Sequence, residues 1–430
     1  AKTQSPHVPR AMAKGIESVF LFVLFFVVSA ALDEQWSKFG SSATGQFMLG
    51  LSMQNGIYVS DDFGNSWRHR GMTNICMWPC RHGAVSVSSD GRKMMVVSGS
   101  ENDRIYLSED FGDSWLLTGP TTETFRSLTA SKDASVIFVG GAGSLWKSIT
   151  WGQNWIQLSG TEHGFQWWGL TSSADGNHVA GITRENYQCI CCGCGSIFVS
   201  SDAGNSWTKQ SPDGSFWDIT STGDFTHLWV ATRRALDTAS IWTSGDSGSS
   251  WTERIVSASH AAVELGIASS FDGSVLAIVF EEMGFHPGWL YLSTDLGLTW
   301  SRAENFDGKN GCNHVAMSEN GVTLVTGGVF GPPFTSSDSG VTWTAGTPFT
   351  TTSTASTTTT TMHTTTEELL GNSTNSTTTT TTTTTTFRST STNTATVVTV
   401  TTTTTTTFPE SENSEAWRWT LPFALWIARL

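Results

Sequence analysis

The sequence that decides the fold is Ser60-Asp61-Asp62-Phe63-Gly64-Asn65-Ser66-Trp67, because the chain repeats its pattern, S-x-D-x-G-x-[ST]-W. Five further copies keep every defining residue: 108–115, 200–207, 244–251, 293–300 and 336–343. A degenerate copy at 148–155 has Thr150 in place of the acid but keeps the serine, glycine and tryptophan. The copies begin roughly 45 residues apart, a period that is typical of repeat architectures.

Each octapeptide has the composition of a hairpin turn. A short apolar run such as Gly56-Ile57-Tyr58-Val59 precedes it and predicts a β-strand. The aspartate can accept hydrogen bonds from its own turn, and the glycine allows a backbone conformation that other residues resist. The tryptophan begins the next strand and provides a large ring to bury between sheets. We therefore interpret the repeated acids as structural, rather than as metal ligands or catalytic carboxylates: Asp62, Asp110, Asp202, Asp246, Asp295 and Asp338.

A second turn lies upstream of each octapeptide. Asp90-Gly91, Asp175-Gly176, Asp272-Gly273 and Asn320-Gly321 each separate two apolar runs, which is a strong hairpin signal. Every unit is thus predicted to contain four antiparallel strands. Seven such units predict an all-β protein, a seven-bladed β-propeller of four-stranded antiparallel blades over residues 33–346.

The octapeptide resembles the Asp-box, or BNR, repeat of sialidases, sortilin-type receptors, some glycoside hydrolases and the photosystem II assembly factors. The resemblance covers roughly Trp36 to Thr344. The single seven-bladed propeller of the photosystem II assembly factors is the most similar in size and repeat count. The resemblance implies a non-catalytic recognition or scaffolding module. It would also imply a plastid location, although no serine- and arginine-rich transit segment precedes the propeller.

The N-terminal region has the pattern of a secretory signal. Met12 and Lys14 precede the apolar run Val19–Val28, and Ser29-Ala30-Ala31 follows it. We interpret residues 12–31 as a signal peptide or a signal anchor, and residues 1–11 as a non-native segment upstream of Met12. The expected location is the secretory pathway, with the mature protein extracellular or at the cell surface.

Composition limits the classes of partner. The formal net charge of −14 argues against binding to nucleic acid or to anionic membranes. A propeller of this length buries a core large enough to fold without a metal or a disulfide. We expect a monomeric propeller with no cofactor, no metal and no catalytic residue, whose partner is a protein or a glycan.

The resemblance also implies that two sets of loops share one face. In Asp-box propellers the loops between blades, and those between the second and third strands, lie opposite the Asp boxes. All seven cysteines fall in such loops: Cys76, Cys80, Cys189, Cys191, Cys192, Cys194 and Cys312. Disulfides are the favoured interpretation in an oxidising compartment. A metal site and free thiols stay open as alternatives, and the odd count leaves at least one thiol over.

Arginines in or beside the same loops form the candidate binding face. The photosystem II assembly factors are similar in carrying an arginine patch on their propeller. A solvated rim of charges is the alternative interpretation. The arginines of the candidate face are Arg81, Arg104, Arg126, Arg184, Arg233 and Arg234.

A glycan-active hydrolase, sialidase-like or another glycosidase, is the alternative function. The Arg-Ile-Pro motif that accompanies sialidase Asp boxes is absent from the sequence, and Tyr187 near Glu185 is the remaining tyrosine–acid pair in a suitable loop. Other glycosidases need two facing carboxylates about 5 to 10 Å apart. Candidates for such a pair are Glu281 and Glu282, with Glu101 or Asp103.

The composition changes abruptly after the propeller. Residues 347–408 are mostly threonine and predict a disordered, mucin-like stalk, in which Asn372 and Asn375 begin N-glycosylation sequons. Residues 409–430 are apolar and aromatic, and they are a candidate membrane tether.

Overall fold

The computed structural model describes two compact units, one ending at Phe349 and the other beginning at Thr350. In the first unit, the described residues are 35–53, 55–70, 83–98, 104–120, 124–159, 166–184, 195–233, 238–257, 262–282, 288–306, 308, 311–328 and 331–346. In the second unit, they are 355–356, 378–391 and 394–407.

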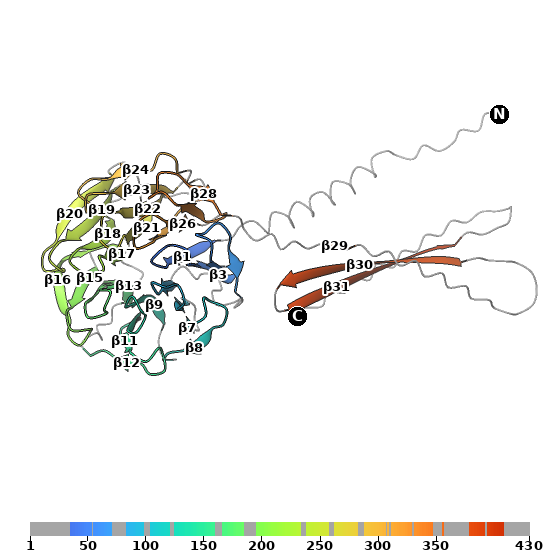
Figure 1. The fold of residues 1–430 in the computed structure, drawn as a ribbon, viewed down its shortest axis with the longest axis horizontal. Helices are drawn as coiled ribbons and strands as arrows, with labels where there is room; N and C mark the ends of the chain where they lie inside the picture. The colour runs from blue at the N-terminus through green and yellow to red at the C-terminus, as the bar shows by residue number, and fades with distance from the viewer. Residues whose placement is uncertain are drawn as a thin grey trace, which may run out of the picture. The chain divides into compact units, whose positions relative to one another are not determined.

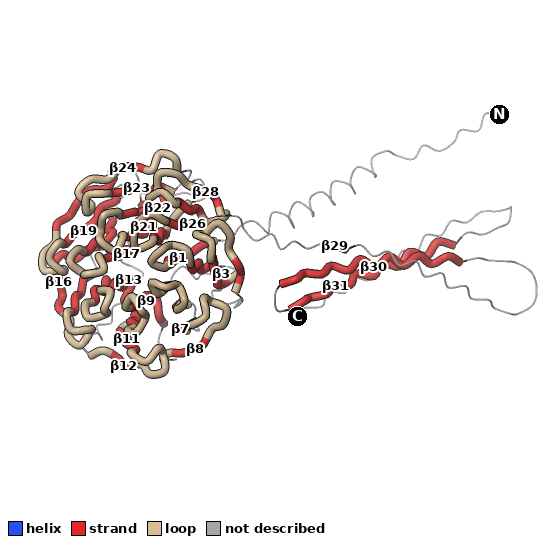
Figure 2. Tube along the Cα trace, viewed as in Figure 1, coloured by secondary structure: helices blue, strands red, loops and turns tan. Residues whose placement is uncertain are grey.

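The described strands of the first unit form seven four-stranded antiparallel sheets, and each sheet consists of four consecutive strands. These sheets are the blades of a propeller, with the first strand of each near the axis and the fourth at the rim (Figure 1). The tube in Figure 2 shows strands and loops and no helix in the described part of this unit. The seven-bladed all-β prediction is confirmed.

The blades have the following bounds. Blade 1 contains β1 (Trp36–Ser41), β2 (Met48–Ser52), β3 (Gly56–Ser60) and β4 (Arg68–His69). Blade 2 contains β5 (Ala84–Val87), β6 (Met94–Val97), β7 (Ile105–Ser108) and β8 (Leu116–Thr118). Blade 3 contains β9 (Phe125–Ala130), β10 (Ile137–Gly141), β11 (Leu145–Ser148) and β12 (Ile156–Gln157). Blade 4 contains β13 (Gln166–Ser172), β14 (Val179–Arg184), β15 (Gly195–Ser200) and β16 (Thr208–Gly214).

The remaining blades follow the same order. Blade 5 contains β17 (Phe216–Ser221), β18 (Leu228–Arg233), β19 (Ala239–Ser244) and β20 (Thr252–Ser257). Blade 6 contains β21 (Ala262–Ser269), β22 (Leu276–Glu282), β23 (Trp289–Ser293) and β24 (Ser301–Arg302). Blade 7 contains β25 (His314–Met317), β26 (Leu324–Gly327), β27 (Phe334–Ser336) and β28 (Thr344–Ala345).

The hydrophobic core lies between neighbouring blades. The second strands are buried on both faces, as β2 and β6 show with every residue buried. One core cluster combines Trp229 and Ile241 of blade 5 with Leu265 and Ile278 of blade 6. Because each blade covers the apolar face of the next, the blades form one continuous ring of packed sheets.

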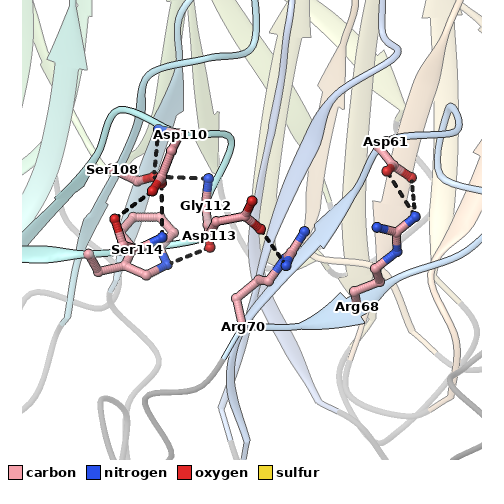
Figure 3. A network of polar contacts seen from close by, with 9 residues as sticks. Asp61, Arg68, Arg70, Ser108, Asp110, Gly112, Asp113 and Ser114 are labelled. Atoms are coloured by element: carbon pink, nitrogen blue, oxygen red, sulfur yellow. Dashed lines mark hydrogen bonds and ion pairs between the residues drawn. The ribbon is translucent and has the colours of Figure 1, made fainter. Parts of the chain in front are cut away.

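The octapeptide forms the turn between the third and fourth strands. In blade 2, the Asp110 carboxylate accepts hydrogen bonds from Ser108 Oγ, Ser114 N–H and Ser114 Oγ (Figure 3). Trp115 Nε1 donates to the carbonyl of Gly112 at 3.0 Å. The carboxylate thus replaces backbone partners that the tight turn cannot provide.

The degenerate copy forms the same turn, but the side chain at the aspartate position accepts fewer hydrogen bonds. Thr150 Oγ1 accepts a hydrogen bond from Asn154 N–H at 2.9 Å, in the place of a carboxylate oxygen. Gly152 N–H still donates to Ser148 Oγ. Trp155 Nε1 donates to Thr118 of blade 2 instead of to its own turn. A hydroxyl in place of the carboxylate is therefore enough to preserve the turn.

The motif glycine also joins the blades. Gly64 has φ +79°, and a Cβ at this position would collide with the Thr335 methyl of blade 7. Phe63, the residue before it, also has a left-handed backbone, with φ 62°. Only glycine combines this conformation with so close an approach. The turn thus fixes its own strands and seats its blade against the preceding one.

The first turn of each blade closes the ring around the axis. Within these turns, a backbone N–H of each blade donates to a carbonyl of the next blade, at distances from 2.7 to 3.0 Å. The last blade donates to the first, through Glu319 N–H and the carbonyl of Ala43. The belt runs through Ala43, Ser89, Lys132, Ala174, Gly223, Phe271 and Glu319. Since strands alternate in direction, this belt and the octapeptide turns lie on the same face, which we call the motif face.

The second unit contains β29 (Ala355–Ser356), β30 (Thr378–Ser391) and β31 (Thr394–Thr407). β30 and β31 pair as an antiparallel hairpin, where the sequence predicts a disordered stalk. Threonine is β-branched and favours extended backbone, which accounts for the pairing. Among the described residues, no helix has the length and apolar character needed to cross a membrane.

Candidate binding site on the propeller axis

β-Bulges interrupt the first strands of several blades at equivalent positions. The pairing of β1, β13, β17 and β21 with their neighbours skips one residue near the start of each strand, and β9 skips one residue opposite Gly140 and Gly141. A bulge redirects the side chain of the extra residue and is common beside functional sites. The residues at the bulges are Ser37, Arg126, Trp168, Trp217 and Val263. They lie toward the face opposite the motif face, which we call the loop face.

Two of these bulges hold an arginine between two tryptophans. The Arg184 guanidinium lies 4.2 Å from the ring centroid of Trp168 and 3.9 Å from that of Trp217. Its Nε donates to the carbonyl of Phe216 at 2.7 Å. Arg126 lies 5.8 Å from the ring centroid of Trp168. Cation–π contacts of this kind contribute about 0.5 to 2 kcal/mol each, so this Arg–Trp stack is a rigid surface across blades 3 to 5.

A cavity of about 160 Å³ lies on the axis. The first strand of every blade contributes to its wall, and the stack residues Arg126 and Trp168 also line it. The cavity and the stack therefore form one continuous site. One wall residue from each first strand, in blade order, is Lys38, Val85, Ser127, Gly169, Asp218, Ile267 and His314.

Side chains of the belt cross the axis on the motif face. Lys132 Nζ of blade 3 lies 2.6 Å from Glu319 Oε2 of blade 7, and Ser89 Oγ of blade 2 donates to the same carboxylate. Lys132 also lies 4.5 Å from the ring centroid of Phe271. Blades 3 and 7 are not neighbours, so this ion pair spans the axis. Access to the cavity is therefore expected from the loop face.

Asp218 is the carboxylate in the described part of the cavity wall. Its Oδ1 accepts from Ile219 N–H at 3.0 Å, and its Oδ2 accepts from Ile267 N–H at 3.2 Å. Burial raises the pKa of Asp218, while the charge of Lys38 and the two backbone donors oppose that rise. Asp218 thus joins the first strands of blades 5 and 6 through their backbones.

The candidate arginines have different surroundings. Arg126 and Arg184 both belong to the Arg–Trp stack, since each guanidinium lies over the Trp168 ring. Arg104 is exposed immediately before β7, and Arg233 ends β18, so the structure places them on the loop face but outside the stack. Arg81 and Arg234 lie outside the described residues.

The cysteine prediction requires one correction. Cys312 does not project from a loop, because it is 1% exposed and packs in the core between blades 6 and 7. Its sulfur occupies the space that a side chain at Gly288 would need. Its burial there is that of a small apolar side chain. The other candidate cysteines lie outside the described residues: Cys76, Cys80, Cys189, Cys191, Cys192 and Cys194.

Two further sets of predicted residues, for N-glycosylation and for glycan hydrolysis, have no described side chains. The sequon residues Asn372 and Asn375, and the loop residues Glu101, Asp103, Glu185 and Tyr187, are outside the described residues. Glu281 and Glu282 end β22, and the backbone of Glu281 pairs with that of Glu264 in β21. Their side chains are not part of the described structure.

The motif acids lie on the motif face, away from the axial site. Hydrogen bonds from Ser206 hold the pKa of Asp202 at about 2, and those from Thr299 hold the pKa of Asp295 at about 2. Each of these two carboxylates accepts hydrogen bonds from residues of its own turn. In the described residues, no group of three or more histidine, cysteine, aspartate or glutamate side chains is arranged to hold a metal ion.

Sequence reasoning missed the cavity residues Lys38, Trp168 and Asp218, and the stack residue Trp217. Regular alternation does not predict a bulge, so it cannot assign these side chains to the axis. The adjacent aromatic residues Trp167 and Trp168 were an available signal, because an alternating strand buries only one of two neighbours in the same core.

Comparison with solved structures shows the same fold in other proteins. A structure of YCF48 bound to a D1 peptide is similar with a TM-score of 0.51 and 13% identity, covering 70% of this chain and 91% of that one. YCF48 from Cyanidioschyzon merolae has a TM-score of 0.51 and 14% identity, covering 71% of this chain and 96% of that one. The GH74 enzyme of Niastella koreensis has a TM-score of 0.39 and 18% identity, covering 71% of this chain and 56% of that one.

No protein-family model matches the sequence, and no curated protein matches it. At these identities the two YCF48 structures show the fold alone, and that fold is a propeller that in one case holds a peptide.

Proposed function

We propose that this protein is a non-catalytic recognition module whose propeller binds a segment of another protein through the loop face. The observation that carries the proposal is the Arg–Trp stack, in which Arg184 is fixed between Trp168 and Trp217 beside the axial cavity. Tryptophan and arginine are the residues most enriched in the dominant contacts of protein interfaces. Because the stack is already ordered, a partner would lose less entropy on binding to it.

The carboxylate arrangement favours binding over glycan hydrolysis. A glycosidase needs two facing carboxyl groups, one of which donates or accepts a proton. In the described cavity wall, Asp218 is the carboxylate, and both of its oxygens accept backbone N–H groups. Such an oxygen is poorly placed to attack a sugar. The YCF48 structure with a bound D1 peptide supports the protein class of partner at the level of the fold.

The terminal regions support a secretory route as part of this proposal. Residues 12–31 have the pattern of a signal peptide, and residues 347–408 carry sequons at Asn372 and Asn375. Residues 409–430 are the candidate tether. On this proposal, the stalk presents the propeller at a cell surface or in a secreted form.

Selection of peptides from a random display library on the full-length protein tests the proposal. Selected peptides should bind Arg184→Met at least about tenfold more weakly, because a hydrogen bond from a charged donor contributes about 1.5 to 3 kcal/mol. Lys209→Met is the matched control, because it removes one positive charge from an exposed ion pair with Asp213 at the rim. Equal loss in both variants would refute a role for the stack.

Fluorogenic glycosides, assayed in parallel, test the hydrolase alternative. Turnover by the wild type that disappears in Asp218→Asn would overturn the recognition proposal and establish an enzyme.

A further inference from the structure

We propose that the axial cavity is a binding site for one carboxylate group, held by Lys38 and Arg126. The proposal goes beyond partner recognition by the loop face and does not depend on it. Lys38 and Arg126 both line the cavity, together with His314 and the single described carboxylate, Asp218.

The position of Lys38 on the axis follows from the bulges. Lys38 follows the bulge at Ser37 in β1, just as Asp218 follows the bulge at Trp217 in β17. The two residues thus occupy equivalent positions in blades 1 and 5. Both residues line the same cavity although their blades are not neighbours.

The charge of Lys38 acts on Asp218, the carboxylate of the described wall, without a direct contact between the two groups. No hydrogen bond or ion pair joins its ammonium group to another described residue, Asp218 included. Both Asp218 oxygens already accept hydrogen bonds from the backbone. An anion in the cavity would therefore give the half-buried ammonium group a direct partner.

The size of the cavity and its charge select the ligand class. A volume of about 160 Å³ accommodates about five water molecules or a small carboxylate, but not a sugar chain. In the described wall, Lys38 and Arg126 offer an anion two cationic groups. A planar carboxylate also matches the fork of a guanidinium such as that of Arg126. The group could belong to a free small acid or to a protein segment that enters from the loop face.

Saturation-transfer NMR on the full-length protein tests the proposal with acetate as the probe. Acetamide has the same shape without the charge, so acetate should bind at least about tenfold more tightly. Lys38→Met should weaken acetate binding by about the same factor, and Lys38→Arg should restore it. Lys209→Met at the rim should leave it unchanged.

Equal binding of acetate and acetamide by the wild type would overturn the proposal without any variant. Unchanged acetate affinity in a folded Lys38→Met protein would also overturn it.

Competition with trialanine and with trialanine amide separates the two sources of the carboxylate. Displacement of acetate by the free peptide and not by its amide supports a carboxylate carried on a protein chain. Acetate binding that neither peptide displaces supports a free small acid. Peptide recognition through the Arg–Trp stack can fail while acetate still binds, so the two proposals are tested independently.

Discussion

Replacing a motif aspartate with the threonine of the degenerate copy measures what the carboxylate contributes. In blade 5, Asp246 accepts hydrogen bonds from Ser244 Oγ at 2.8 Å, Ser250 N–H at 2.8 Å and Ser250 Oγ at 2.6 Å. Thr150, at the same position in blade 3, keeps one such bond, from Asn154 N–H. Asp246→Thr should therefore lose two bonds of about 1 kcal/mol each.

Exposure of the turn reduces this value, so we expect the free energy of unfolding to fall by about 1 to 2 kcal/mol. Urea titration followed by tryptophan fluorescence measures it. The reverse change, Thr150→Asp, should raise the free energy of unfolding by about 1 kcal/mol, because it adds acceptors for a turn that is already formed.

Ser201→Thr is the control, because it introduces the same side chain at an exposed motif position that makes none of these bonds; its effect should stay within about 0.5 kcal/mol. If Asp246→Thr is as stable as the wild type, the carboxylate does not stabilise the turn. The repeated acid would then need another explanation.

Three further predictions concern the fold. The pKa of Asp202 in the folded protein, about 2, lies below its ordinary value of 3.8, so its stabilising contribution is complete above pH 3.8 and is lost as the pH falls toward 2. Melting temperatures between pH 6 and pH 2 should thus fall less steeply in Asp202→Asn than in the wild type. Gly64→Ala should destabilise the propeller by at least about 2 kcal/mol in urea, because the new methyl meets Thr335 at a left-handed φ; a neutral result would contradict the close blade contact. Glu319→Gln should cost less than about 1 kcal/mol by the same titration, because its ion pair with Lys132 is partly exposed; a larger loss would show that the axial crossing holds the ring together.

The blades were predictable because their determinants are local. The aspartate, glycine and tryptophan of the octapeptide meet within one turn, so their spacing in the sequence is their spacing in space. The degenerate copy was recognisable for the same reason, since Ser148, Gly152 and Trp155 stay in register around Thr150. Seven such turns at a regular period leave few architectures other than a propeller.

The axial site was only partly predictable because it depends on register. Arg126 and Arg184 were identified from loop positions, yet their common contact with Trp168 results from bulges in two different blades. A bulge is a mismatch between two paired strands, so the sequence of one strand alone does not predict it. Cys312 was misplaced for a related reason. A segment that reads as a loop can still pack inward when a glycine such as Gly288 leaves space for it.

The closed belt makes the propeller suitable for circular permutation. Trp36 N–H donates to the carbonyl of Gly328, and Gly346 lies against Trp67, so both ends of the propeller meet at one seam between blades 1 and 7. Every blade is built from four consecutive strands, and no strand is shared across that seam. The seam has the same belt hydrogen bond as the six other junctions, from Glu319 N–H to the carbonyl of Ala43. A circular permutant that joins the ends there and opens between any other two blades retains every bond of the belt.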